Sequence, residues 1–224
     1  MQLIRNLFST NECVKYIKLA DEKVTAHHGE NIEMAPDHYG FQDENLVRLI
    51  EDKLKDKIHL PVYIDSFGDE FVYSGICDNF NLFRFHIGYQ MKKHVDYVRD
   101  TSRDKRNVAL LIIYLNTIPV ENGGATYFND LFLSVQSEQG NALAFMIDKV
   151  PHKSTKLKEG TRYSAHDHRE YPFGLSVKRY ILVCDIEYTI SKSKDENRRR
   201  ELYELKKQNL QDKFIALRKE YYLL

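Results

Sequence analysis

The sequence predicts a mainly β fold of the α+β class, in which a barrel or sandwich of short strands is flanked by helices at both ends of the chain. Apolar residues recur at helical spacing in two segments before residue 62. From Val62 onward they alternate with polar residues, as in half-buried strands, and Gly and Asn turns separate the runs. After Ser191 the chain becomes highly charged and the helical spacing returns.

Length and composition limit the classes of protein to consider. The 224 residues fit one domain with a sizeable core, and the 33 basic residues balance 33 acidic ones. A net charge of zero argues against a bulk surface for nucleic acid or membrane. The 3 cysteines form no CxxC pair, which favours a reducing compartment, and no apolar run has transmembrane length. We therefore expect a cytoplasmic protein without a signal peptide or a nucleic-acid partner.

Two helices are expected before the strands. Ser9–Glu12 has the form of a capping box, so a first helix should span about 10–24. The polar stretch up to residue 42 contains Gly and Pro and is expected to be a loop or a short irregular strand. Asp43 can then cap a second helix that ends before Pro61, with an apolar stripe of Leu46, Leu49, Ile50, Leu54 and Ile58.

The β core is expected over residues 62–190, and a last helix after it. The capping-box form of Ser193–Glu196 and an apolar stripe predict an amphipathic helix over 191–224, available for packing on the core, for a partner or for self-association. The expected strands are 71–75, 82–89, 92–98, 108–116, 125–128, 131–136, 142–147, 151–157, 161–168 and 178–189.

The pair His94 and Asp96 marks a candidate metal site. On a strand, residues two apart point to the same face, so the imidazole and the carboxylate would lie together. They are two of the three protein ligands of a facial Fe(II) site, and a later histidine would be the third. The pair alone is weak, since this composition would produce roughly one His-x-Asp by chance.

The sequence around this pair is similar to that of the prolyl 4-hydroxylase-like Fe(II)/2-oxoglutarate-dependent oxygenases. Segment 81–96 reads NLFRFHIGYQMKKHVD. In that family an Asn and an Arg precede an aromatic residue, a glycine follows three on, then an apolar residue three further, and then the His-x-Asp pair. Segment 110–116 resembles the family's apolar strand ending in Tyr-Leu-Asn, and 123–128 its Gly-Gly-Glu-Thr-x-Phe, with Ala125 replacing the glutamate.

The resemblance covers about residues 4–190 and implies an oxygenase domain over 1–190, with a helical part over about 1–61. Its fold would be a double-stranded β-helix, a jelly-roll related to the cupins, with flanking N-terminal helices. Segment 7–13, LFSTNEC, resembles the start of the family's first helix. The C-terminal helix lies outside the match.

The third iron ligand and the cosubstrate anchor each have two candidates. His152 lies twelve residues after Gly140, as the family's distal histidine should, and Arg162 follows ten residues later in an Arg-x-Ser form with Ser164. A guanidinium can grip the distal carboxylate of 2-oxoglutarate by two parallel hydrogen bonds. In the competing register His168 is the third ligand and Arg179 the anchor. The spacing favours His152 with Arg162 and leaves the other pair open.

The resemblance implies that Fe(II), 2-oxoglutarate and O2 act at this site, with ascorbate as an optional further cofactor. The implied reaction hydroxylates an unactivated C–H, most plausibly of a prolyl residue in a peptide or protein, and releases succinate and CO2. Two alternatives stay open, namely an oxygenase of free amino acids or other small molecules and an inactive jelly-roll binding protein. Relatives often carry a tyrosine at the position of Phe85, and this difference leaves the inactive binding protein open.

Overall fold

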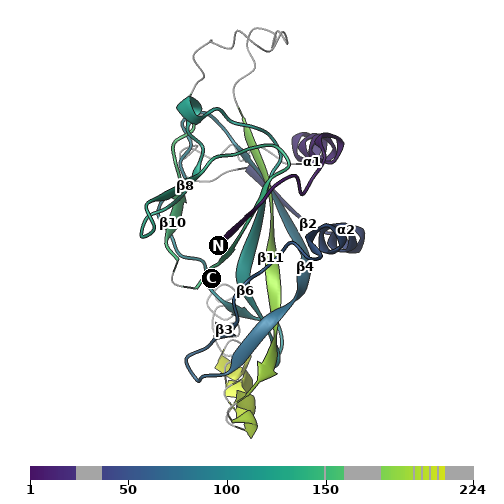
Figure 1. Ribbon diagram of the computed structural model, residues 1–224, viewed down its shortest axis with the longest axis vertical. Helices are drawn as coiled ribbons and strands as arrows, with labels where there is room; N and C mark the ends of the chain where they lie inside the picture. The colour runs from purple at the N-terminus through teal and green to yellow at the C-terminus, as the bar shows by residue number, and fades with distance from the viewer. Residues whose placement is uncertain are drawn as a thin grey trace, which may run out of the picture.

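Two facing β-sheets and two helices form the body of the molecule. The computed structural model describes residues 1–23, 37–148, 150–158 and 178–209, except 194, 198, 202 and 206. In the larger sheet the strands follow the order β1-β9-β6-β11-β4-β2, with β3 paired to β4 and β5 to β6, and the smaller sheet has the order β10-β7-β8. Figure 1 shows the helices against one side of the larger sheet and the smaller sheet across from its other side.

The elements are α1 (Thr10–Lys23), α2 (Glu44–Leu54), a short 3-10 turn (Val120–Asn122) and eleven strands. The strands are β1 (Gln2–Ile4), β2 (Asp37–Gln42), β3 (Tyr63–Ile64), β4 (Glu70–Phe85), β5 (Arg99–Asp100), β6 (Lys105–Tyr114), β7 (Thr126–Phe128), β8 (Leu133–Val135), β9 (Ala142–Met146), β10 (His152–Ser154) and β11 (Arg179–Lys192).

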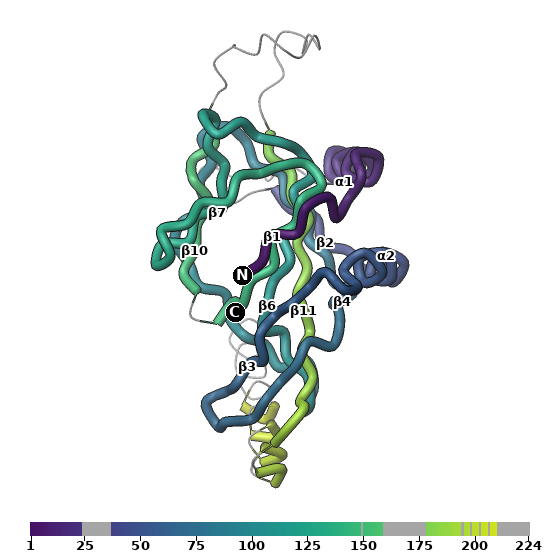
Figure 2. The backbone as a smooth tube through the Cα atoms, viewed as in Figure 1, coloured from purple at the N-terminus to yellow at the C-terminus, as the bar shows by residue number. Residues whose placement is uncertain are grey.

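Strand β11 separates the core into two parts. It pairs antiparallel with both β4 and β6, so it is central in the larger sheet. Its even-numbered residues, among them Tyr180, Leu182 and Ile186, pack in the cluster that holds the buried residues of α1 and α2. Ile181 and Val183 lie in the second cluster, toward the smaller sheet. The two-residue period of a strand thus sends one face of β11 to the helices and the other to the space between the sheets, which Figure 2 shows as two separated backbone layers.

Both N-terminal helices are confirmed. Ser9 and Glu12 form a reciprocal capping box, with the Ser9 amide donating to Glu12 Oε2 at 2.7 Å and the Glu12 amide to Ser9 Oγ at 3.3 Å. The Asp43 carboxylate accepts from the Leu46 amide at 3.0 Å and caps α2. Helix α2 stops earlier than expected, because Lys55 already leaves the helical conformation.

The strand expected over 92–98 is wrong, since His94 forms only an isolated bridge there. This segment crosses between the sheets. Met91 hydrogen-bonds to Ser154 of β10, whereas Arg99 in β5 pairs with β6. The two strands expected at 71–75 and 82–89 are one strand, β4, because register shifts opposite β11 absorb the glycine and asparagine residues that predicted a break.

Strands β1 and β2 form two edges of the larger sheet; β1 was not predicted, whereas β2 lies in the stretch expected to be a loop or a short irregular strand. They pair with β9 and β4, respectively, and each has one neighbour in the sheet order. An edge strand needs no continuous apolar pattern, and β2 reads DHYGFQ. Residues 1–61 therefore supply strands as well as helices to the fold.

Part of the predicted C-terminal helix lies within the described residues, which are helical between 196 and 209. Arg199 ties it to the turn before β6, with Nη2 3.0 Å from Asp104 Oδ1. Residues 210–224, and with them most of the expected apolar stripe, lie outside the description. Among the described helices none is both long and apolar enough to cross a membrane.

Candidate active site

His94 and His152 are joined through their backbones. Each donates its amide to the carbonyl of the other at 3.0 Å. The Nδ1 of His94 is 2.8 Å from the carbonyl oxygen of Lys92, and the Nδ1 of His152 is 3.2 Å from that of Val150. A carbonyl only accepts, so both Nδ1 atoms carry the proton and both Nε2 atoms keep a free lone pair. The centroids of the two rings are 4.3 Å apart.

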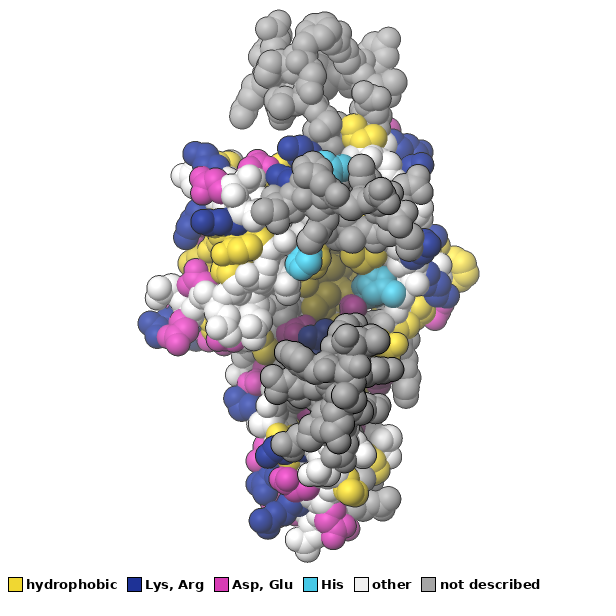
Figure 3. All heavy atoms as spheres, turned by 180° about the vertical axis from the view of Figure 1, so that it is seen from behind, with side chains coloured by type: hydrophobic (Ala, Val, Ile, Leu, Met, Phe, Trp, Pro, Cys, Tyr) yellow, Lys and Arg dark blue, Asp and Glu magenta, His cyan; other side chains and the backbone are white. Residues whose placement is uncertain are grey.

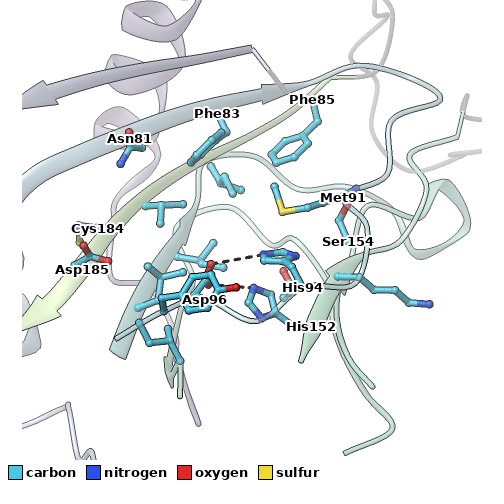
Figure 4. Close-up of a pocket in the computed structure, with 18 of the residues that line it drawn as sticks. Asn81, Phe83, Phe85, Met91, His94, Asp96, His152, Ser154, Cys184 and Asp185 are labelled. Atoms are coloured by element: carbon cyan, nitrogen blue, oxygen red, sulfur yellow. Dashed lines mark hydrogen bonds and ion pairs between the residues drawn. The ribbon is translucent and has the colours of Figure 1, made fainter. Parts of the chain in front are cut away.

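Asp96 completes a three-residue cluster with these histidines. Its Oδ1 is 3.8 Å from His94 Nε2, and its Oδ2 is 3.5 Å from His152 Nε2. One ligand atom from each residue lies within 4.8 Å of the other two. Figure 4 shows the three side chains converging. Two neutral imidazoles and a carboxylate are the donor set of a facial Fe(II) site, so these residues fit a divalent iron ion.

The His152 ring is buried against two phenylalanine rings. Only 6% of its side chain is exposed, and it packs against Phe145 edge-on at 5.0 Å and against Phe128 at 5.9 Å. Burial lowers the pKa of His152 and outweighs the opposing effects of the Val150 carbonyl and of the Asp96 charge. The imidazole is therefore neutral at neutral pH, as a metal ligand must be.

The three residues lie in a pocket between the two sheets. Its walls are mostly apolar, and they include residues of β4, β6 and β11 opposite the small sheet. Figure 3 shows a hollow on this side of the molecule, with hydrophobic side chains at its base and histidine side chains beside it. The lining includes Phe83, Phe85, Met91, Leu110, Ile112, Ile147, Ile181 and Val183.

Arg179 is a buried cation on the wall of this pocket. It is 2% exposed, and its guanidinium carbon lies 5.0 Å from the centre of the Phe85 ring and 5.6 Å from that of Tyr114. Burial lowers the pKa of Arg179. Its Nη2 donates to Thr126 Oγ1 at 3.2 Å, its Nε has no hydrogen-bond partner, and no carboxylate among the described residues pairs with it. A buried, unpaired guanidinium is a ready site for an anion.

The side-chain amide of Asn116 holds the backbone on both sides of Arg179, which is the first residue of β11. Its Nδ2 donates to the Lys178 carbonyl and its Oδ1 accepts from the Tyr180 amide, both at 2.8 Å. The amide thus clamps the residues on both sides of Arg179. Asn116 therefore positions Arg179 through its backbone contacts.

Thr126 is a site residue that the sequence analysis missed. It lines the pocket, and its Oγ1 accepts from both Arg179 Nη2 and the Tyr114 hydroxyl, the latter at 3.0 Å. The signal was present in the Gly-Gly-Ala-Thr segment, where Gly123 and Gly124 adopt positive φ of 70° and 68°. A Cβ on Gly123 would lie 2.1 Å from the Lys156 carbonyl oxygen, so the turn that leads to Thr126 requires glycine.

The favoured anchor and the alternative third ligand cannot be placed. Arg162, Ser164 and His168 lie outside the described residues. Of the two predicted registers, the described chain thus brings together His152 from one and Arg179 from the other, in one pocket.

Residues 80–167 match the model of the 2OG-Fe(II) oxygenase superfamily. This match supports a 2-oxoglutarate-dependent oxygenase at the level of the superfamily, and it implies Fe(II), 2-oxoglutarate and O2 as its cofactor and cosubstrates. No curated protein matches the sequence.

Solved structures of prolyl hydroxylases share the fold. The viral collagen prolyl hydroxylase of Paramecium Bursaria Chlorella virus-1, in complex with 2OG, is 18% identical with a TM-score of 0.54, over 85% of this chain and 96% of that chain. A prolyl hydroxylase from Trichoplax adhaerens, in complex with a hypoxia inducible factor peptide fragment, is 13% identical with a TM-score of 0.54, over 90% and 86%. A Pseudomonas putida prolyl-4-hydroxylase is 11% identical with a TM-score of 0.51, over 86% and 92%.

The predicted fold class is thereby confirmed. The two facing sheets are the double-stranded β-helix of the 2OG-Fe(II) oxygenases, with helices packed on the larger sheet. The resemblance to prolyl 4-hydroxylase-like oxygenases, predicted from the motifs, agrees with both the superfamily match and these solved structures.

Proposed function

We propose that this protein is an Fe(II)- and 2-oxoglutarate-dependent dioxygenase that hydroxylates a prolyl residue of a peptide or protein, with His94, Asp96 and His152 as iron ligands. The convergence of the three side chains supports the ligand set. Bound iron and 2-oxoglutarate would supply the oxidising power against an unactivated C–H bond. The protein's own residues would bind the cosubstrate, keep water out and select the carbon.

The observation that carries the proposal is the buried guanidinium of Arg179 in the same pocket as the His-Asp-His cluster. A buried charge without a partner is unfavourable until an anion neutralises it. The distal carboxylate of 2-oxoglutarate is such an anion, and a guanidinium holds a carboxylate through two parallel bonds. We assign Arg179 as the anchor in preference to Arg162 and Ser164, whose positions the described residues do not include.

Thr126 would donate a hydrogen bond to the anion that Arg179 binds. A hydroxyl has one proton and two lone pairs, and both lone pairs of Thr126 Oγ1 are taken by donors, namely Tyr114 Oη and Arg179 Nη2. The Thr126 proton is therefore left to point at an acceptor. Phe85, which stands where relatives often have a tyrosine, gives Arg179 an aromatic surface without a hydroxyl.

The walls of the pocket would exclude water from the reacting groups. Phe83, Ile112 and Ile181 line the pocket near the charged groups, and an apolar surround strengthens hydrogen bonds to a bound anion. The prolyl assignment is supported by the fold shared with prolyl hydroxylases, one of them bound to a peptide fragment. The other open substrate class is a free amino acid or small molecule.

The direct test is an anaerobic titration of the protein with Fe(II) and then with 2-oxoglutarate. We expect a metal-to-ligand charge-transfer band that requires both additions, and succinate release when oxygen is admitted. A screen of proline-containing peptides for a mass gain of one oxygen atom, with free amino acids in parallel, identifies the substrate class. Absence of the band and of succinate in the wild-type protein would refute the oxygenase, whereas oxidation of free amino acids alone would refute the prolyl assignment.

A further inference from the structure

Asp185 places a carboxylate in the pocket, far from Arg179. Both residues are on β11, six positions apart, so about 20 Å separates their backbone positions. Both residues line the pocket, and so do residues 181 and 183, which lie between them on the strand. Figure 4 shows Asp185 and Asn81 to the left of the His-Asp-His cluster, and Phe85 and Met91 above His94. Since Arg179 packs on Phe85, the pocket has a cation at one end and a carboxylate at the opposite end.

The carboxylate of Asp185 is held in place by a chain of side chains. Asn107 Nδ2 donates to Asp185 Oδ2 at 2.9 Å, and Cys77 Sγ donates to Asn107 Oδ1 at 3.2 Å. Burial raises the pKa of Cys77 to about 12, so the thiol keeps its proton and remains the donor. This fixes the Asn107 amide with its nitrogen toward Asp185. Asp185 Oδ1 is left without a hydrogen-bond partner among the described residues.

The charges around Asp185 do not already neutralise it. Burial raises the pKa of Asp185, and it outweighs the lowering by the charge of Arg99, an exposed residue that also lines the pocket, and by the hydrogen bond from Asn107; the charge of Asp96 raises the pKa further. Arg99 and Asp185 form no ion pair with each other in the described structure. A half-buried carboxylate with one free oxygen attracts a group that brings both charge and hydrogen-bond donors.

We infer that Asp185 is a specificity-determining residue that selects substrates carrying a cationic group, an ammonium or a guanidinium, on the side of the iron site away from Arg179. The inference rests on the proposed function, because it takes the Arg179 end for 2-oxoglutarate and leaves the Asp185 end for the substrate. The cation could come from a basic side chain of a peptide or from the amine of a small molecule.

Two sets of probes separate these sources. The first is one fluorescently labelled peptide sequence with a central proline, in which a flanking position is lysine, norleucine or glutamate in turn. The second is free lysine, norleucine and glutamate. Binding is measured anaerobically on the wild-type protein with Fe(II) and 2-oxoglutarate present, so that nothing turns over. We expect the lysine member of one set to bind about tenfold more tightly than its norleucine counterpart, as a charge-assisted hydrogen bond should.

Asp185→Asn should abolish this lysine preference, whereas Asp185→Glu should keep most of it. Glu187→Gln is the matched control, because Glu187 is on the same strand and is paired with Lys105 outside the pocket. It removes the same charge and should leave the preference unchanged. Circular dichroism and the 2-oxoglutarate charge-transfer band of each variant show that the fold and the iron site are intact.

The inference fails if wild-type protein binds the three members of both sets equally or not at all. It also fails if the glutamate member is preferred, which would indicate that the cation of Arg99 selects the substrate. It also fails if Asp185→Asn keeps the lysine preference. If the charge-transfer band is normal in these cases, only the inference about Asp185 fails and the proposed oxygenase function is retained. Loss of the band in the wild-type protein refutes the proposed function itself.

Discussion

The amides of His94 and His152 each bond to the carbonyl of the other residue at 3.0 Å, so the two histidines are held together by main-chain atoms. Their side chains can therefore be changed without removing the contact that brings the segments together. The two candidate metal ligands are thus positioned by main-chain contacts, and each ring is further oriented by the carbonyl two residues before it.

Replacing either histidine by alanine should remove iron binding and keep the fold. For His94→Ala and His152→Ala we expect Fe(II) affinity to fall by more than about 100-fold, since even changes behind a ligand reach that size. His86→Ala is a control, because His86 bonds to Asp37 and does not line the pocket. Anaerobic Fe(II) titration measures the affinity and circular dichroism the fold. Full affinity in His152→Ala would remove this residue from the ligand set.

Arg179→Met should weaken 2-oxoglutarate binding without destabilising the protein in its absence. The methionine keeps contact with Phe85 and Tyr114 but removes a buried charge that has no carboxylate partner in the described structure. We expect 2-oxoglutarate affinity to fall at least about tenfold and the melting temperature of the free protein to be no lower. Arg162→Ala, tested alongside, should leave the affinity unchanged. The opposite result would restore Arg162 as the anchor.

Asp37→Asn should change how stability depends on pH. Burial alone would raise the pKa of Asp37, but hydrogen bonds from His86 and Arg84 lower it below the ordinary value of 3.8. A lowered folded-state pKa gives stability that is present above pH 3.8 and is lost as the pH falls through the folded value. The variant should be about 2 kcal/mol less stable at pH 7, with the difference shrinking below pH 3.8. Urea unfolding across this range measures it, and a constant difference would contradict the assignment.

Gly140→Ala should destabilise the protein more than Gly88→Ala. Both glycines have positive φ, of 81° and 89°. A Cβ on Gly140 would lie 2.2 Å from the Phe8 carbonyl oxygen, whereas Gly88 has open space around it. Backbone strain alone is about 1 kcal/mol for each, and the clash at Gly140 should bring its total to about 3 kcal/mol. Urea unfolding of both variants tests this, and equal losses would show that the chain shifts to accommodate the added atom.

The sequence predicts the parts of this protein in which local pattern and packing agree. The helices capped by Ser9 and Asp43 are of this kind, since cap and apolar stripe together indicate where each helix begins. The segment around His94 is different, because it passes from one sheet to the other and no local pattern encodes that crossing. For edge strand β2 the sequence left a loop and a short irregular strand both open, because one neighbouring strand is enough to hold a polar sequence.

The candidate site shows the same division. His94 and Asp96 are two positions apart in sequence, so motif spacing finds them, whereas Arg179 joins them through the pairing of β11 with β4. Thr126 and Asp185 required knowledge of which strand faces the pocket. Once the direction of Arg179 is known, the period of two along β11 would have predicted Asp185.

The alternation along β11 has a consequence for how this enzyme could acquire new substrates. Residues 181, 183 and 185 face the pocket, while 180, 182 and 186 face the helices. Point substitutions on the first set can alter selectivity with little effect on the hydrophobic core. A single-residue insertion or deletion would exchange the two sets and place the core residues in the pocket. Diversification of this strand should therefore proceed by substitution at constant length.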